Sequence, residues 1–566
     1  MTKKNAAPVF KEYMMGQMVL LPVDLDEEID PEHLVRVIHT VVEKMDLSKL
    51  YAQYAGGGTS SYHAKMMLKV LIYAYTQQIF SSRKIAKELR ENIHFMWLSG
   101  NSRPDFHTIN RFRSEIVKET INEIFAAVLL ILEEGGYINL ENYFVDGTKL
   151  EANASKYSYV WAKNTKRYKE RVQQKVGQLL EKIEQLNQAE DSEYGEHDLP
   201  ERGGRQPMNA AQLAAKIEEL NVQLRKMTCG DDNSPPQPVP SAGAQPEPTS
   251  ASPSPEMQLE ASVPERTQAD KRHKSKTEQL AKGIRQLEEE LLPRLKKYEE
   301  QDTILGDRNS YSQTDHDATF MRMKDDHLQN GQLKAGYNIQ TGTEKQFVVG
   351  FSVHQRPGDP GCLIPHLEET KQQRSGRQPK NVIADSAYGS EENYDYLEKE
   401  NIQAFVKYNT FHQETKSRRK PNPFAVEQMP YDENRDLFIC PNGQELLYKT
   451  TQRYRSDNGY ESNRRLYACV DCSQCPLKAQ CTKAEGNRQV KVSFRLWEMR
   501  ARAKTMLLSE QGIALRKQRP IDVETVFGRI KQNWGFRRFL LRGLQKVSTE
   551  WGLLCIAHNL AKLAAA

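Results

Sequence analysis

The sequence predicts an α/β protein in which helices flank a mixed sheet, together with all-helical segments. The apolar run Tyr143 to Val145 leads into a single carboxylate, Asp146, and a second apolar run, Val382 to Ala384, leads into Asp385. Between residues 303 and 412, segments of strand and helix character alternate. Such alternation is typical of a mixed sheet covered by helices.

Length and charge limit the class of protein. A chain of 566 residues suffices for several domains. No apolar run approaches the roughly 20 residues that span a bilayer, and the N-terminus lacks the apolar core of a signal peptide. We therefore expect a soluble, intracellular protein. From Arg500 to Lys546 there are 12 Lys/Arg against 3 Asp/Glu. This basic segment favours a polyanion partner, although a solvated basic face would look the same.

Residues 1–138 are expected to form a helical domain. The segments 30–45, 62–80, 81–98 and 107–136 have helical apolar spacing, and Ser81 and Ser82 are candidate caps. Short helices that are joined by tight turns and carry basic residues suit a helix-turn-helix-like DNA reader, while a plain helical domain is the alternative. The candidate DNA contacts here are Arg83, Lys84, Arg111 and Arg113.

Residues 160–302 are expected to form a coiled-coil arm. Apolar residues recur at heptad spacing in three stretches, which begin at Val172, Leu213 and Leu280. Between the second and third, the stretch from Pro235 to Pro264 holds nine prolines among Ser, Ala and Gln. This composition cannot bury a core, so we expect a disordered linker at about 230–266. The arm could contact DNA or a second subunit, or could be a self-contained helical hairpin.

The sheet is expected to begin in residues 139–159 and to continue in 303–412. The segments 333–342 and 345–354 predict a hairpin with its turn at 342–344. Since two strands each end in an aspartate, Asp146 and Asp385 should emerge at one sheet edge. Adjacent buried carboxylates repel, and two Mg²⁺ or Mn²⁺ ions would remove that repulsion and could catalyse phosphodiester chemistry.

A third carboxylate is expected from residues 500–566. Following Pro520, the chain should be helical from Asp522 to Trp534, with Glu524 and Lys531 on one face. Glu524 could then point to the two aspartates while Lys531 reaches a phosphate. The alternative is an ordinary surface glutamate. Further candidate DNA contacts in this segment are Arg516, Arg519, Arg529, Arg537, Arg538 and Arg542.

These blocks resemble the DDE transposases of bacterial insertion sequences. The resemblance rests on FVDGTKLEANASKY, VIADSAYGS and VETVFGRIKQNWGFRRFLLRGL, on SGNSRPDFHTINRFR near the N-terminus, and on the Glu-x6-Lys spacing of Glu524 and Lys531. It implies an RNase H-like core with Asp146, Asp385 and Glu524 as ligands of two metal ions. It also implies binding to terminal inverted repeats and target DNA by a homodimer, with cleavage at the transposon ends and joining of the 3′-OH ends to target DNA. The resemblance further implies a cytoplasmic, nucleoid-associated protein of a bacterium.

Two positions depart from the pattern of the wider group. Many members place a Tyr seven residues and an Arg four residues before the Glu, where this chain has Lys517 and Pro520. Arg516 and Arg519 are candidates to replace that phosphate contact.

Residues 413–499 are expected to form a Cys-rich insertion domain. Five cysteines lie between 440 and 481, and a tetrahedral Zn²⁺ takes four. We favour Cys440, Cys472, Cys475 and Cys481, with Cys469 as the alternative fourth ligand. An iron–sulfur cluster and unligated cysteines are the other interpretations, and disulfides are not expected in a reducing cytoplasm.

Two alternative functions stay open at this point. The chain could be an inactive DNA-binding regulator derived from a transposase, or an RNase H-like endonuclease without strand transfer.

Overall fold

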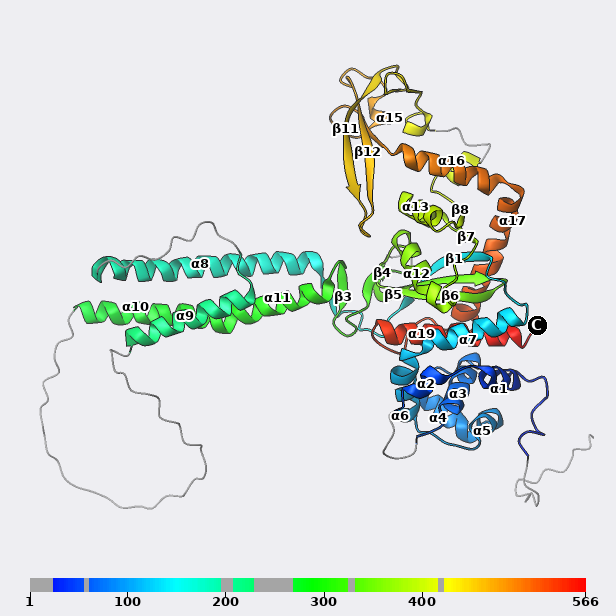
Figure 1. The fold of residues 1–566 in the computed structure, drawn as a ribbon. Coiled ribbons are helices and arrows are strands. Elements are labelled where there is room, and N and C mark those ends of the chain that lie inside the picture. Colours follow the sequence, from blue (N-terminus) through cyan, green and yellow to red (C-terminus); the bar gives the residue numbers. More distant parts are fainter. Residues whose placement is uncertain (1–23, 55–60, 195–206, 229–267, 324–330, 416–421) are drawn as a thin grey trace, which may run out of the picture. The chain divides into compact units, whose positions relative to one another are not determined.

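The structure is a computed structural model that describes residues 24–54, 61–194, 207–228, 268–323, 331–415 and 422–566 (Figure 1). It divides into two compact units, one of Met1–Ser158 with Ser312–Ala566 and the other of Tyr159–Tyr311. The linker expected at about 230–266 lies outside the described residues. Among the described helices, none has the length and apolar character to cross a membrane.

A mixed sheet forms the centre of the first unit, as the sequence predicts. Its strands run in the order β4-β5-β1-β7-β8, and β6 also pairs with β5. Strand β1 is antiparallel to β5 and parallel to β7, which is parallel to β8. The bounds are β1 Asn142–Glu151, β4 Thr319–Arg322, β5 Leu333–Glu344, β6 Phe347–His354, β7 Asn381–Ala384 and β8 Gln403–Val406.

The first apolar strand does not end at Asp146 as expected. Strand β1 continues to Glu151, and its ladder with β5 includes Asp146 opposite Thr341. The continuation is stable because Thr148 and Leu150 are buried on the strand. The Asp146 carboxylate forms an ion pair with a buried arginine, Arg519. A charge inside a sheet is tolerated when it has such a partner.

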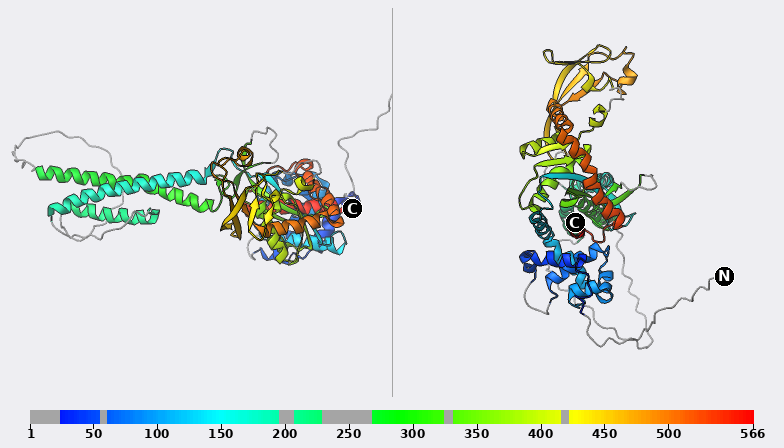
Figure 2. Two further views of the ribbon diagram at one scale, coloured as in Figure 1. Left: turned by 90° about the horizontal axis from the view of Figure 1, so that it is seen from above. Right: turned by 90° about the vertical axis from the view of Figure 1, so that its right-hand side faces the viewer.

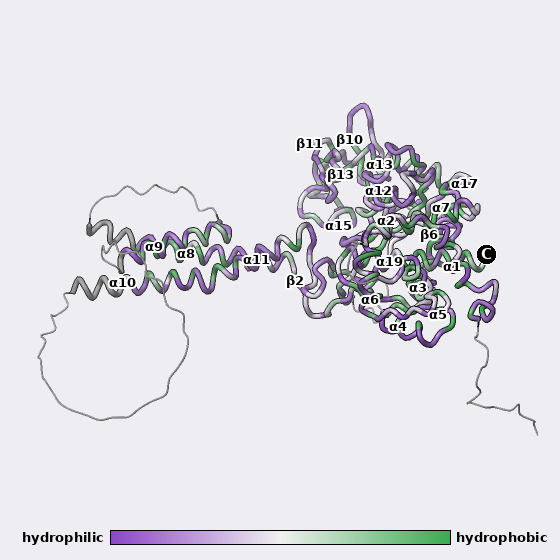
Figure 3. Tube along the Cα trace, turned by 60° about the horizontal axis from the view of Figure 1, so that its bottom comes forward, coloured by the Kyte–Doolittle hydropathy of each residue, from purple (hydrophilic) through white to green (hydrophobic). Residues whose placement is uncertain are grey.

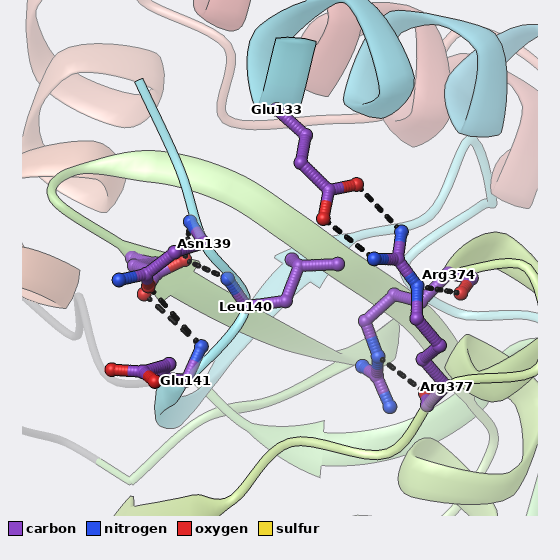
Figure 4. A network of polar contacts seen from close by, with 7 residues as sticks. Glu133, Asn139, Leu140, Glu141, Arg374 and Arg377 are labelled. Carbon is purple, nitrogen blue, oxygen red and sulfur yellow. Dashed lines mark hydrogen bonds and ion pairs between the residues drawn. The ribbon is translucent and has the colours of Figure 1, made fainter. Parts of the chain in front are cut away.

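The hairpin turn also differs from the expected one. Strand β5 extends through Glu344, and the turn is formed by Lys345 and Gln346, which both have positive φ. Two-residue hairpin loops favour this conformation. The Glu344 carboxylate accepts the backbone N–H groups of Asn139 and Leu140 at 3.0 and 2.7 Å, which fixes the chain as it enters β1 (Figure 4). In the same region Arg377 pairs with Glu133.

Helices pack around the sheet. Helices α16 and α17 contact β7 and β8, and α12 and α19 contact β6 (Figure 2). The helix expected from Asp522 to Trp534 is interrupted by two π-helical turns, Pro520–Glu524 and Arg529–Asn533. The bounds are α12 Leu363–Gln373, α13 Glu391–Lys399, α14 Phe411–Thr415, α16 Phe494–Leu508, α17 Glu510–Arg519, α18 Thr525–Gly528 and α19 Leu544–Leu563.

The N-terminal segments are helical as expected, with one division. Asn92 breaks the segment 81–98, and its side chain accepts the His94 N–H at 3.0 Å to cap the second helix. Helix α3 is buried on every side, against α1 and α19. The bounds are α1 Leu34–Lys44, α2 Ser48–Ala52, α3 Ala64–Thr76, α4 Ser82–Glu91, α5 Ile93–Ser99, α6 Phe106–Arg111 and α7 Ile121–Glu134.

The second unit consists mainly of long helices with one apolar core. Their bounds are α8 Ala162–Tyr194, α9 Ala210–Thr228, α10 Gln268–Arg285 and α11 Leu292–Leu305. Hydrophobic and hydrophilic residues alternate along them (Figure 3). Val172, Leu213 and Leu280, the first residues of the three heptad stretches, all belong to the shared core. The short strands β2 Tyr159–Trp161 and β3 Ser310–Ser312 pair with each other.

The Cys-rich segment folds as a small antiparallel β domain. Its strand order is β13-β12-β11-β10-β9, and a cluster that includes Phe438, Leu446 and Tyr467 forms its core. The bounds are β9 Tyr431–Asp432, β10 Leu437–Ile439, β11 Glu445–Arg455, β12 Glu461–Cys469, β13 Gln489–Val492 and the short helix α15 Lys478–Cys481.

Candidate active site

The register of β1 and β7 brings two aspartates to the same level. Phe144 pairs with Ile383, so Asp146 and Asp385 each follow two residues later on neighbouring parallel strands. Neighbouring strands lie about 4.8 Å apart, and residues two apart share a face. The two carboxylates that the sequence singles out are therefore adjacent on one face of the sheet.

A buried guanidinium lies against these carboxylates. Arg519 Nη2 is 3.2 Å from Asp146 Oδ1, and their side chains are only 7% and 17% exposed. Burial by itself raises the pKa of Asp385, but the Ser386 N–H and the positive charge of Arg519 outweigh it and lower that pKa. The Arg519 guanidinium thus pairs with Asp146 and also favours the ionised form of Asp385.

A second basic group, Lys407, belongs to the same site. It directly follows β8, and its pKa is lowered by burial and by the charge of Arg519, while the charges of Asp385 and Glu524 act in the opposite direction. The sequence analysis did not identify Lys407. Its position after an apolar strand, like that of Asp385, was the available signal.

The third carboxylate lies at the rim. The π-helical turn that contains Glu524 contacts β1 and β5, and Glu524 itself is exposed. Lys531, further along the segment, is buried and its Nζ is 3.3 Å from Thr148 Oγ1. Because Thr148 shares a strand face with Asp146, the segment from Glu524 to Lys531 covers the same face of β1.

The π-helical turn accounts for the departure from the related pattern. A π turn closes over five residues where an α turn closes over four. Arg519, five residues before Glu524, therefore lies where an arginine four residues before it would lie on a regular helix. The presence of Pro520 does not remove an arginine from this face of the segment.

A polar network supports β1 from its other face. Asp359 Oδ1 accepts Asn338 Nδ2 at 2.8 Å and Gln340 Nε2 at 3.1 Å, and Tyr388 donates to Gln340. A Cβ on Gly147 would lie 2.6 Å from Asp359 Oδ1, so only glycine fits beside Asp146. The sequence analysis assigned no role to Asp359 or Gln340, because the pairing that joins them is visible only in the folded sheet.

The carboxylates have the ligand chemistry that a divalent ion requires, but they are not yet arranged as ligands. Asp146 and Asp385 offer hard oxygen donors on one face, where a positive charge is already held. Within the described residues, no three His, Cys, Asp or Glu side chains are grouped to hold a metal ion. The donor set fits a divalent cation if Arg519 moves away from Asp146 and Glu524 moves in.

The other predicted DNA contacts occupy several kinds of position. Arg538 and Arg542 donate to the backbone carbonyls of Ala152, Ala154 and Asn153, so they brace the chain after β1. The remaining candidates of the C-terminal segment contact neighbouring side chains: Arg516 stacks on Phe411, Arg529 on Trp534, and Arg537 donates to Gln532.

Arg113 lies in the interior rather than on a DNA-facing surface. It donates to Phe80 O at 2.8 Å and to Tyr75 Oη at 3.2 Å, and only 3% of it is exposed. By contrast Arg83, Lys84 and Arg111 are exposed on α4 and α6. Spacing alone could not separate these two groups, because the helix face that packs on the core is set by tertiary contacts.

The five cysteines of the small β domain are free thiols, and Cys440, Cys469 and Cys472 lie in or against its apolar core. Cys440 begins a tight turn in which Gly443 N–H donates to its carbonyl at 2.8 Å. Burial raises the pKa of Cys481, with smaller contributions from Cys440, Cys472 and Cys475. Burial and Cys472 also raise the pKa of Cys469, to about 12. The described thiols are close neighbours but are not grouped as a metal site.

Two families match the chain. The family described as Transposase DDE domain matches residues 439–564, which contain Glu524 and Lys531. The family described as Transposase domain (DUF772) matches residues 23–115, which cover most of the N-terminal helices. Comparisons with curated proteins and with solved structures gave no match. The α/β fold agrees with a transposase-type nuclease, as does the site, in which carboxylates lie beside basic side chains. The two family matches support its identification as a DDE transposase of an insertion sequence.

Proposed function

We propose that the protein binds the ends of its insertion sequence, cleaves phosphodiester bonds there and joins the 3′-OH ends to target DNA. The observation that supports this most directly is the placement of Asp146 and Asp385 at one level of adjacent parallel strands, beside Arg519 and below the segment from Glu524 to Lys531. The order β5-β1-β7-β8, with β6 also paired to β5, is in keeping with an RNase H-like core.

In this proposal Asp146, Asp385 and Glu524 hold two Mg²⁺ or Mn²⁺ ions. Such a pair, when bound, activates the attacking oxygen and stabilises the leaving oxygen of a phosphodiester. Arg519 releases Asp146 as the site fills, and its guanidinium is then available to a phosphate oxygen. Lys531, held beside Thr148, contributes a fixed positive charge on the same face. The reaction needs no covalent bond between protein and DNA.

The test is cleavage and joining of a labelled end fragment to plasmid DNA. Asp146→Asn, Asp385→Asn and Glu524→Gln should each abolish both steps while end binding persists. Glu141→Gln is the matched control, because Glu141 lies just before β1 and pairs with Lys380 at the surface. Cleavage near the wild-type rate would remove that residue from the site. Binding without either step in the wild-type protein would indicate an inactive regulator, and cleavage without joining would indicate a simple endonuclease.

We also propose one structural Zn²⁺ on Cys440, Cys472, Cys475 and Cys481, with Cys469 as the alternative fourth ligand. Support comes from the mutual influence of these thiols on the pKa of Cys481 and from the tight turn at Cys440. Elemental analysis of the purified protein should give about one zinc per chain, lost in Cys440→Ser and kept in Cys229→Ser. Protein without zinc would contradict the assignment.

A homodimer completes the proposal, since two ends must be brought together. Light scattering of the complex with end DNA should give two chains per pair of ends, and one chain would contradict it.

A further inference from the structure

Strands β11 and β12 form a two-stranded ribbon that extends beyond the small β domain (Figures 1 and 2). Strand β10 pairs with β11 only from Glu445 to Leu447, and β13 pairs with β12 only from Arg465 to Ala468. Between Gln452 and Arg464, the two strands pair with each other alone. An isolated hairpin is marginally stable in water and adds nothing to the core of the domain, so its length needs another explanation.

The ribbon surface is basic and aromatic. Along β11, all residues from Leu447 to Arg455 are exposed except Gln452, which is partly exposed. Guanidinium groups lie over tyrosine rings, Arg464 at 3.6 Å from the centre of Tyr454 and Arg465 at 4.8 Å from that of Tyr448. Lys449, Arg455 and Arg464 form no ion pair with any residue that the structure describes. The ribbon therefore presents three positive charges without an ion-pair partner among the described residues, while the exposed Asp457 at its tip is a carboxylate that likewise lacks one among them.

The tip of the ribbon contacts the catalytic sheet region. Arg356 donates to the Asn458 side chain, and Asn458 Nδ2 donates to Gly361 O at 3.4 Å. These partners flank Asp359, which lies against Gly147 behind the catalytic strand β1. The ribbon thus connects the small domain to the loop that braces the strand of Asp146.

We propose that this ribbon is a duplex-DNA-binding arm that enters the major groove beside the cleavage site. The major groove is about 12 Å wide and admits a two-stranded β-ribbon, and Lys and Arg on such a ribbon reach phosphates and guanine edges. The inference rests on the proposed function, because the DNA is the end of the insertion sequence. The contact at Asn458 sets the distance between the bound groove and Asp146.

The test is binding of the full-length protein to a labelled 50-base-pair duplex taken from the DNA beside the gene, over a range of salt concentrations. Replacing Lys449, Arg455 and Arg464 together by Gln should weaken binding at least tenfold and reduce the salt slope by about 2 to 3, since each phosphate contact contributes about 0.9. The matched control replaces Lys49, Lys380 and Lys399 by Gln, which removes the same charge from side chains that are 71%, 73% and 71% exposed. It should bind like the wild-type protein.

Two further measurements separate charge and groove from folding. A variant that keeps the charges, Lys449→Arg with Arg455→Lys and Arg464→Lys, should retain the affinity and slope. Methylation of guanine N7, which blocks the major groove, should impair binding by the wild-type protein and not add to the defect of the Gln variant.

Wild-type affinity in the Gln variant would overturn the proposal, as would an equal loss in the charge-keeping variant. If the ribbon proposal fails in this way while Asp146→Asn still abolishes cleavage, the proposed function stands without the arm. If Asp146→Asn cleaves normally, the proposed function itself fails.

Discussion

Arg519 is expected to compete with divalent metal for Asp146. Its Nη2 lies 3.2 Å from Asp146 Oδ1 and both side chains are largely buried. At an effective dielectric constant near 20, this separation corresponds to about 5 kcal/mol of attraction. Desolvation of the two charges offsets much of it. If the ion pair retains a net stabilisation of at least about 1.4 kcal/mol, its removal should raise the affinity of the site for a divalent ion at least tenfold.

The perturbation is Arg519→Gln, measured by Mn²⁺ binding to the full-length protein without DNA, using electron paramagnetic resonance to count free ion. Mn²⁺ should bind at least tenfold more tightly to the variant. Strand cleavage should nevertheless fall, because the variant lacks the guanidinium that would reach the phosphate. Arg502→Gln is the control, since Arg502 pairs with Glu398 on the surface and should leave Mn²⁺ affinity unchanged. Unchanged or weaker Mn²⁺ binding in Arg519→Gln would refute the competition.

Three other predictions concern stability and geometry. Burial raises the pKa of Glu369 from 4.5 to about 7. Because the folded protein holds this proton more tightly than the unfolded chain, the free energy of unfolding should fall by up to about 3 kcal/mol as the pH rises from 4.5 to 7. Glu369→Gln should then raise the melting temperature at pH 8 and leave it nearly unchanged at pH 4, and an equal shift at both would contradict the cause. Arg113→Gln should lower the free energy of unfolding in urea by about 3 kcal/mol, because the buried Glu550 carboxylate loses a nearby positive charge. Glu550 also accepts the N–H groups of Leu540 and Leu541, so it stays in the core. A change under 1 kcal/mol would show that Arg113 is not structural. Gly147→Ala should reduce the rate of cleavage at least tenfold, because the new methyl group would clash with Asp359 and Gln340. Gly177→Ala is the control and should fold and cleave normally, because its methyl group would have no neighbour within 4 Å. Retained activity in Gly147→Ala would mean that the network behind β1 can adjust.

The sequence predicted the class of fold because apolar periodicity and turn residues are local properties. The apolar strand before Asp385 ends where it was expected to end, and the mixed sheet with helical cover is confirmed. The extension of β1 past Asp146 was not predictable, since a charge within a strand reads as a strand end until its partner is known. That partner, Arg519, lies 373 residues away along the chain, and only tertiary packing brings it to the strand.

The site was predicted in part for the same reason. Motif spacing could select Asp146, Asp385 and Glu524, but it could not show that Glu524 lies at the rim or that a π-helical turn shifts Arg519 by one position. Asp359 has no spacing signal that distinguishes it from a surface charge, and the one signal for Lys407 is its position directly after an apolar strand. Burial likewise separates Arg113 from Arg111, although they are two residues apart on one segment.

Helix α19 packs on β6 on one side and on α3 and α7 of the N-terminal helices on the other. At Gly552 the approach is so close that a Cβ would lie 2.5 Å from Ile121 and 2.8 Å from Phe351. Without α19, each neighbour would leave part of its apolar surface uncovered. During translation, the N-terminal helices therefore lack this packing partner until residues 544–563 have been made.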